Sequence, residues 1–292
     1  MMFYLIVFLI VVRMTVGDPV RVPLYRCAFN DPCVDISDVD TGGSRRAILT
    51  LSNFFVRNTL TGATTNVPIT LGGNSTFHYE TRFHLEGQES IGMGPSSPIV
   101  NRHGSAALIR GSRNDSLVLG LSVSEFTNTC IADSIMTLSL ADPEWMVDGV
   151  VEIITADGRL DRADTEPFYA DITRRRNAFP REYVISIWDH LIAQGARFTE
   201  RLDAHNDSLV MSNCTAEAVL SSPFIRFSFG DRNEQQIFLL PQDYIRRDPD
   251  TSTCTLLFGI IETPTMWVFA PLTIPQTNIF VNQTSLIICD SA

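Results

Sequence analysis

The stretch Phe168-Tyr-Ala-Asp171-Ile-Thr-Arg-Arg-Arg-Asn-Ala-Phe-Pro180 leads from an apolar approach to an aspartate in a tight loop, with a proline nine residues further on. The next run, from Val184 to Ile192, carries its apolar residues at helical spacing. Gly195 lies where such a helix is expected to stop. The sequence therefore predicts a loop that presents the Asp171 carboxylate, followed by a helix whose apolar face packs in the core.

The length and composition are those of a globular protein. A chain of 292 residues can bury one large hydrophobic core or two medium ones. It is 45% hydrophobic and 19% charged, and its formal net charge is −11 at pH 7. Because the chain lacks a general basic surface, nucleic acid is not expected as a partner.

The N-terminal run from Met2 to Val12 is apolar throughout and is followed by Arg13. It is much shorter than the ~20 residues that span a bilayer, so no stable membrane span is expected. Thr15-Val-Gly17 supplies the small residues of a cleavage site. We therefore expect residues 1–17 to be a signal peptide and the protein to be secreted or to lie in the lumen of the secretory pathway. A buried β-strand is the alternative interpretation of the apolar run.

Six cysteines in a chain that enters the secretory route are expected to form disulfides. The segment Asn30-Asp-Pro between Cys27 and Cys33 is turn-forming, which makes a local bridge sterically reasonable. No Cys-x-x-Cys occurs and the five histidines are scattered, so neither a metal nor another cofactor is expected. Five Asn-x-Ser/Thr sequons predict glycosylation, at Asn74, Asn114, Asn206, Asn213 and Asn282.

Several short segments point to one known family. Ile91-Gly-Met-Gly94 precedes Asp115-Ser-Leu-Val-Leu-Gly120, and further on come Ile237 to Ile245 and Trp267-Val-Phe-Ala-Pro271. In this order they resemble segments of the pepsin-like aspartic peptidases. The family strand that Ile91 to Gly94 resembles passes closely under the active-site loop, where a Cβ atom would clash. The resemblance extends from about Pro19 to Ile288.

The resemblance implies an all-β fold, mainly β with a few short helices, in which two lobes enclose a cleft that binds extended polypeptide. It implies a monomer with a shortened N-terminal lobe at residues 18–140 and a C-terminal lobe at residues 141–292. It also implies a Cys214–Cys254 bridge within the C-terminal lobe and a Cys130–Cys289 bridge between the lobes. A free pair is the alternative for Cys130 and Cys289.

The resemblance gives roles to residues of two loops. Asp171 takes the place of the aspartate in the family's second catalytic loop, which reads Asp-Thr/Ser-Gly-Thr/Ser. Ile172, Thr173 and Arg174 take the Thr, Gly and hydroxyl positions, and Thr173 is expected beside the bound polypeptide. Phe55 takes the place of the tyrosine that covers the polypeptide, so it keeps an apolar lid and loses a hydrogen bond. A core aromatic is the alternative for Phe55.

The first catalytic aspartate of the family has no clear counterpart. The placement above puts it near Met14, where no carboxylate occurs; removal of a signal peptide or a truncated gene model would account for this. Asp40-Thr-Gly42 spells the family tripeptide, but its approach from Val34 to Val39 alternates apolar and polar residues. A loop in the core of a lobe is normally fed by a continuously apolar strand. We therefore favour a surface turn for Asp40.

Aspartic peptidases need two carboxylates close enough to share one proton. One member takes a proton from water while the other donates to the scissile carbonyl, and a single aspartate cannot do both at once. The sequence therefore predicts a secreted, catalytically impaired homologue that retains a polypeptide-binding cleft. The alternative is an active aspartic endopeptidase, working at acidic pH, in which Asp40 and Asp171 form the pair. No Gly-x-Ser-x-Gly segment or Gly-rich phosphate loop offers another chemistry.

Overall fold

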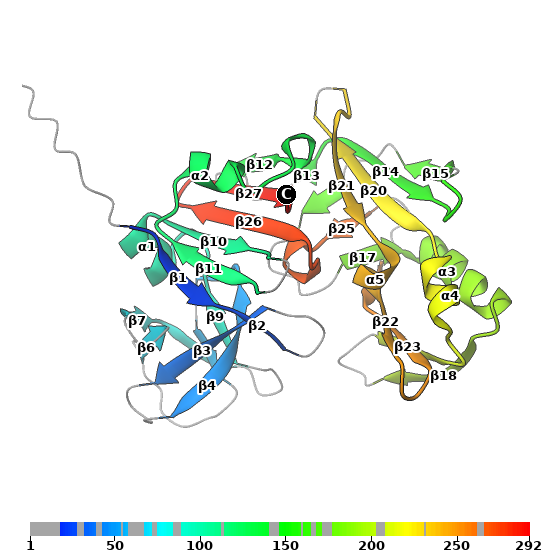
Figure 1. Ribbon diagram of the computed structural model, residues 1–292, viewed down its shortest axis with the longest axis horizontal. Coiled ribbons are helices and arrows are strands. Elements are labelled where there is room, and N and C mark those ends of the chain that lie inside the picture. The colour runs from blue at the N-terminus through cyan, green and yellow to red at the C-terminus, as the bar shows by residue number, and fades with distance from the viewer. Residues whose placement is uncertain are drawn as a thin grey trace, which may run out of the picture.

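The computed structural model describes residues 18–27, 32–38, 43–53, 55–57, 67–71, 75–83, 89–111, 114–139, 146–158, 160–164, 168–170, 177–202, 208–230, 232–261 and 266–292. Across these ranges the protein is mainly β with a few short helices, as the sequence predicts. Figure 1 shows most strands from the first 120 residues, together with the two C-terminal strands, on the left. Most strands from the second half of the chain lie on the right.

One antiparallel sheet joins the beginning and the end of the chain. Its six described strands follow the order β1-β11-β10-β26-β27-β12. Their bounds are Val20–Pro23 (β1), Ser105–Ile109 (β10), Ser116–Leu119 (β11), Met136–Ser139 (β12), Thr277–Asn282 (β26) and Ser285–Asp290 (β27). The C-terminal hairpin β26–β27 thus lies between β10 and β12, which come from much earlier in the chain.

Both faces of this sheet are covered. Alternate residues point to opposite faces of a strand, and one face of β10 and β26 packs into the main core through Ala106, Leu108, Ile279 and Val281. The other face forms a smaller cluster that includes Ala107, Val118, Phe280 and Ile287. Helix α2 (Val123–Thr127) covers this second face with Phe126, whose ring centroid lies 5.3 Å from that of Phe280.

A second sheet is built from the N-terminal part of the chain. Its path is β7-β6-β3-β4-β9-β5-β8, and β2 pairs with β3. The bounds are Tyr25–Arg26 (β2), Pro32–Asp38 (β3), Ser44–Thr50 (β4), Phe55–Arg57 (β5), Val67–Leu71 (β6), Ser75–Tyr79 (β7), Thr81–Phe83 (β8) and Ser90–Gly92 (β9). Most of its pairs are antiparallel, but β4–β9 and β5–β8 are parallel.

Three smaller sheets contain most strands of the second half. The first has the order β13-β16-β25-β17-β24, with bounds Met146–Val147, Phe168–Ala170, Val268–Phe269, Asn177–Pro180 and Phe258–Ile261. The second has the order β15-β14-β20-β21, with bounds Leu160–Asp164, Gly149–Ile154, Phe224–Phe229 and Gln235–Leu239. The third has the order β18-β19-β23-β22, with bounds Arg197–Leu202, Ser208–Ser212, Thr253–Leu256 and Ile245–Asp248.

The described helices are short, with one exception. They are α1 (Pro98–His103), α2, η2 (Ala132–Ser134), α3 (Arg181–Ala193), α4 (Ala216–Leu220), α5 (Pro241–Tyr244) and η3 (Pro271–Thr273). Helix α3 confirms the helix that the apolar spacing predicts, and it buries Val184, Ile187 and Leu191. Gly195, which follows it, has φ +95°, a left-handed conformation that glycine adopts at little cost.

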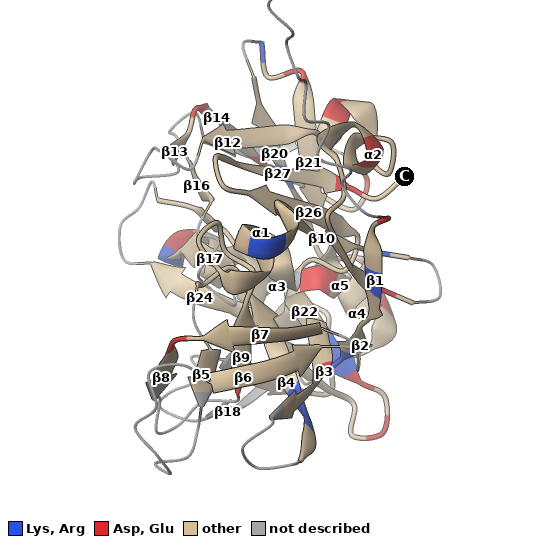
Figure 2. Cartoon of the chain, turned by 90° about the vertical axis from the view of Figure 1, so that its left-hand side faces the viewer, with Lys and Arg blue, Asp and Glu red and all other residues tan. Residues whose placement is uncertain are grey.

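Figure 2 shows acidic and basic residues on helices and connections and also on strands such as β1 and β4. Among the described residues, no helix is both long enough and apolar enough to cross a membrane.

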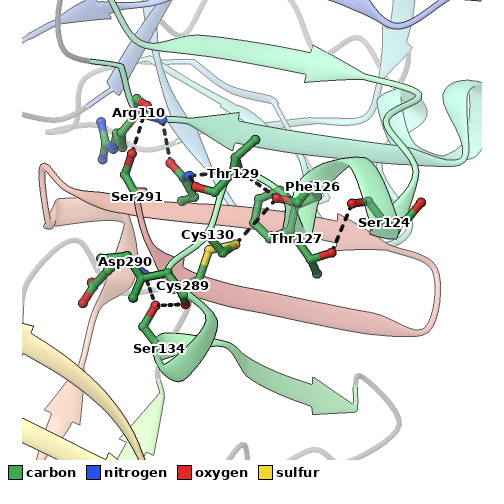
Figure 3. The surroundings of a disulfide bond; sticks show 12 residues. Arg110, Ser124, Phe126, Thr127, Thr129, Cys130, Ser134, Cys289, Asp290 and Ser291 are labelled. Carbon is green, nitrogen blue, oxygen red and sulfur yellow. Dashed lines mark hydrogen bonds between the residues drawn. A yellow bond between two sulfur atoms is a disulfide. The ribbon is translucent and has the colours of Figure 1, made fainter.

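All six cysteines are paired in the structure. Cys27–Cys33 closes the connection between β2 and β3, and Cys214–Cys254 links the end of β19 to β23. Cys130–Cys289 joins the segment after α2 to β27, with a Cα–Cα distance of 5.6 Å (Figure 3). These are the pairs expected from the sequence and the family resemblance. The third pair connects residues that are 159 positions apart in the chain.

Candidate functional site

Two groups of four strands share one arrangement. In the first group, β4 is parallel to β9, β9 is antiparallel to β5, and β5 is parallel to β8. In the second group, β16 is parallel to β25, β25 is antiparallel to β17, and β17 is parallel to β24. In each group a loop joins the strand at one end to the third strand in spatial order, so the chain contains two copies of one unit.

The hydrogen bonds indicate how the two copies correspond. Ile48 pairs with Ser90, and its N–H donates to the Glu89 carbonyl at 2.8 Å. Tyr169 pairs with Val268, and its N–H donates to the Trp267 carbonyl at 2.9 Å. In a parallel pair only alternate residues of a strand donate to a given neighbour, so a shift by one residue would break this match. This hydrogen-bond phase supports an alignment of Ile48 with Tyr169.

Counting two residues on from Ile48 and from Tyr169 gives Thr50 and Asp171. Thr50 is the last residue of β4 and Ala170 is the last of β16. Asp171, Thr173 and Asp40 all lie outside the described residues. The predicted site residue Asp171 thus has a described counterpart, and this counterpart is a threonine.

The side chain of Thr50 takes part in a small hydroxyl network. Its Oγ1 lies 2.9 Å from Ser52 Oγ and donates to the Ile91 carbonyl at 3.4 Å. The Thr50 carbonyl accepts from Met93 N–H at 2.8 Å. The described part of this first loop runs from Thr50 to Asn53. Its side chains carry hydroxyl, apolar or amide groups, and none is a carboxylate.

In this alignment the counterpart of the Asp171 loop follows β4, whereas Met14, near which the family resemblance puts the first loop, lies outside the described residues. The strand that feeds the loop is β4, where Ala47, Ile48 and Leu49 are at most 3% exposed. A sequence signal was present, because Ala47 to Leu51 is close to the continuous apolar run expected of a strand buried on both faces. Because this run contains no aspartate, the sequence comparison did not identify the loop.

Two glycines allow the first loop to pack closely against β9. A Cβ atom on Gly92 would stand 2.0 Å from the Ser52 carbonyl oxygen, and one on Gly94 would stand 2.4 Å from that of Leu51. Gly94 N–H donates to the Ser52 carbonyl at 2.8 Å. The expected close backbone approach of Ile91 to Gly94 is therefore confirmed, and the loop that it accommodates begins at Thr50.

The second copy of the unit is held differently. Its counterpart of Gly92, counted from the same pairing, is Ala270, whose N–H donates to Asn177 Oδ1 at 2.8 Å. Both residues are at most 1% exposed. Trp267, one strand position before β25, is fully buried, and its ring centroid lies 5.2 Å from that of Phe179. A side-chain methyl group is thus accepted where the first copy requires glycine.

Phe55, the residue expected over the bound polypeptide, is buried. This residue begins β5, pairs with Ile91 and Thr81, and is 0% exposed within the main core. The alternative, a core aromatic, is the one that its burial supports. The placement over bound polypeptide stays a prediction from the family resemblance.

Asp40 falls between two strands that are antiparallel neighbours. β3 and β4 pair from Cys33↔Ile48 to Ser37↔Ser44, and the segment that joins them lies outside the described residues. Along β3, Val34 and Ile36 are buried while Ser37 is exposed, which agrees with the predicted alternation. This connection is not part of either four-strand copy.

The electrostatic surroundings of the first loop are close to neutral. Tyr79 donates its hydroxyl to the Gly92 carbonyl at 2.8 Å, and burial raises the pKa of this phenol well above its ordinary value. Glu89 is 8% exposed and forms an ion pair with Arg45 at 2.8 Å. In the part of the chain that the structure describes, no three His, Cys, Asp or Glu side chains come together as a metal site would require.

Two carboxyl groups with raised pKa values lie elsewhere, and sequence reasoning missed both. Burial raises the pKa of Asp243 to about 6 and that of Asp290 to about 6. No local sequence motif predicts that either carboxyl is buried, because the segments that bury each one are distant in the chain.

Comparison with known proteins adds no family assignment: no family model matches the chain, and a search of curated proteins found no match.

Proposed function

We propose that the protein is a divergent, secreted homologue of the pepsin-like aspartic peptidases that binds extended polypeptide in a cleft between two lobes and is catalytically impaired. The lobes correspond to residues 18–140 and 141–292, and each contributes one copy of the four-strand unit. The observation that carries the proposal is the correspondence of Thr50 with Asp171 in the two copies.

The duplicated unit supports a site built from two equivalent loops. Each copy leads from a buried strand into a loop and back into the same sheet, so two related loops are available, one from each half. The sheet that pairs β10 with β26 supports the link between the halves, because it contains strands from both ends of the chain.

The chemistry explains the impairment. Two carboxyl groups that share a proton give one general base and one general acid near acidic pH. A threonine hydroxyl does not ionise in this range, so Thr50 cannot supply the second carboxylate. The hydroxyl is also engaged with Ser52 and the Ile91 carbonyl. A site with Asp171 alone therefore lacks the proton exchange that peptide hydrolysis requires.

Three disulfides agree with the proposed compartment. Such bonds form and persist in oxidising environments such as the secretory lumen and the extracellular space. The exposed Asn114 and Asn213 and the half-exposed Asn282 are accessible sequon asparagines among the described residues, whereas Asn74 and Asn206 lie outside them.

The active alternative, with Asp40 as partner of Asp171, has less support. Asp40 belongs to the connection of an antiparallel hairpin, β3–β4, outside the repeated unit. A pair related by the repeat would join Asp171 to position 50 instead.

The direct test is proteolysis of denatured haemoglobin or casein between pH 3 and pH 6. The unmodified protein is expected to give no rate above the blank. Thr50→Asp is expected to create a measurable rate that Asp171→Asn abolishes, because it restores a second carboxylate. Thr50→Asn is the matched control, since it has the same shape without the acid. Proteolysis by the unmodified protein that disappears in Asp171→Ala would refute the impaired site.

A second test probes the correspondence without relying on activity. Cysteines placed at positions 50 and 171 of the folded protein are expected to be joined by a short thiol-to-thiol crosslinker, as peptide mapping would show. Cysteines at positions 49 and 171 are the register control and are expected to crosslink much less. Equal yields, or none at either pair, would contradict the proposed pairing of the two loops.

A further inference from the structure

Asp243 is a buried acid at the contact between two parts of the fold. It belongs to α5 and is 4% exposed. Its Oδ2 accepts from Leu240 N–H at 2.7 Å and from Gln276 Nε2 at 2.9 Å. Its Oδ1 is buried and has no hydrogen-bond partner among the described residues. Oδ1 is therefore removed from water without a hydrogen bond that replaces its hydration, which is costly when the carboxyl is charged.

Asp290 lies on the other side of the same contact, at the end of β27. Figure 3 shows its side chain directed away from the neighbouring Cys130–Cys289 bridge. Its carboxyl accepts a hydrogen bond from the Phe238 backbone, and its Oδ1 is likewise buried with no partner in the described part of the chain. Phe238 is in β21, three residues from the Pro241 that begins α5.

Gln276 connects the two acids. Its side chain donates to Asp243, and its backbone carbonyl accepts from Ser291 N–H at 2.7 Å. Ser291 directly follows Asp290. The segment from Phe238 to Asp243 is therefore tied to the C-terminal strand by one carboxyl group from each side.

We propose that Asp243 and Asp290 form an acid-dependent latch, which holds β21 and α5 against the C-terminal strand when at least one carboxyl is protonated and loosens when both are charged. This role is independent of the proposed peptidase site, because neither residue belongs to the four-strand units.

The charges around the pair do not neutralise it. Burial is the largest cause that raises the pKa of each carboxyl, and the charge of Asp243 raises that of Asp290 further. The charged or titratable groups on the described elements packed against the pair are Tyr244 on α5, Glu217 on α4, Arg246, Arg247 and Asp248 on β22, Arg226 on β20 and Asp133 on η2, with Arg110 near Ser291. Arg110 is bound to Asp115 and Arg247 donates to the Cys214 carbonyl.

The direction of the pH effect follows from the raised pKa. In the unfolded chain an aspartate titrates near ~3.9, so the folded protein binds these protons more tightly. The resulting stability is fully present below pH ~4 and is lost as pH rises through about 6. For Asp243 alone, the two pKa values differ by about two units, which corresponds to a fall of about 100-fold in the folding equilibrium constant.

Urea unfolding at intervals from pH 4 to pH 7 tests the latch. The unmodified protein is expected to lose stability over this range. Asp243→Asn with Asp290→Asn is expected to remove most of the loss, because the amide resembles the protonated acid. Asp133→Asn, an exposed acid on the adjacent η2, is the matched control and is expected to leave the pH profile unchanged. A double variant that keeps the full pH dependence would overturn the proposal.

Hydrogen exchange on the unmodified protein provides a test that no folding defect can obscure. After correction for intrinsic rates, the amides of Leu240 and Ser291 are expected to lose at least 10-fold protection between pH 4 and pH 7. Amides in the middle of α3 are expected to keep theirs. Uniform change at all these amides, or none at Leu240 and Ser291, would contradict a local latch.

Discussion

Replacing Arg110 by methionine is expected to destabilise the protein strongly, because this arginine is a buried junction of several strands. Its guanidinium donates to Asp115 Oδ2 at 2.9 Å, to the Leu272 carbonyl at 2.8 Å and to the Thr277 carbonyl at 3.3 Å. The side chains of Arg110 and Asp115 are each 3% exposed. These contacts join the end of β10 to the start of β26.

The magnitude follows from what the substitution leaves behind. Without Arg110 the Asp115 carboxylate stays buried, with Arg26 as a more distant cation at 3.7 Å. Two buried carbonyls also lose charged donors. Breaking a buried ion pair by removing one partner costs about 3–5 kcal/mol of unfolding free energy. Arg110→Met is therefore expected to lower stability by about that amount.

Urea unfolding at pH 7, followed by tryptophan fluorescence, measures the effect. Asp115→Leu and the double variant complete a cycle, in which the double variant is expected to lose clearly less than the sum of the single losses. The reason is that an apolar pair of similar volume leaves no unpaired charge. A loss below about 1 kcal/mol for Arg110→Met, or strict additivity in the cycle, would refute this account.

Three further substitutions test the packing around the candidate site and the shared sheet. Gly92→Ala is expected to cost about 3 kcal/mol in urea unfolding, because its Cβ would meet the Ser52 carbonyl at 2.0 Å; Gly43→Ala, with open space around it, is the control and should cost little. Phe55→Ala is expected to lower the unfolding free energy by about 3–5 kcal/mol, and weaker peptide binding at unchanged stability would instead support the lid role. Replacing Cys130 and Cys289 by alanine should lower the unfolding free energy by about 3–5 kcal/mol. Replacing Cys27 and Cys33, which close a much shorter loop, should lower it by about 2 kcal/mol. Equal losses would show that loop length does not govern the effect.

The sequence by itself determined those features whose cause is local. Helix α3 follows from apolar spacing, which the hydrogen-bonding geometry of a helix imposes on its own residues, while the mainly β class agrees with what the family resemblance implies. The close backbone approach at positions 92 and 94 is not local, and it was anticipated only through the family resemblance. The three cysteine pairs agree with those suggested by the ordered resemblance along the chain.

Only the tertiary structure decided which segments correspond to each other. Phe55 and Thr50 lie in strands whose partners are 26 to 42 residues away, and their place in the repeated unit follows from register and hydrogen-bond phase. A sequence comparison that looks for an aspartate does not find this loop, because Thr50 stands at the position where the aspartate would identify it. The raised pKa values of Asp243 and Asp290 have the same origin, since burial by distant strands and helices, rather than any neighbour in sequence, sets the energy of their charged forms.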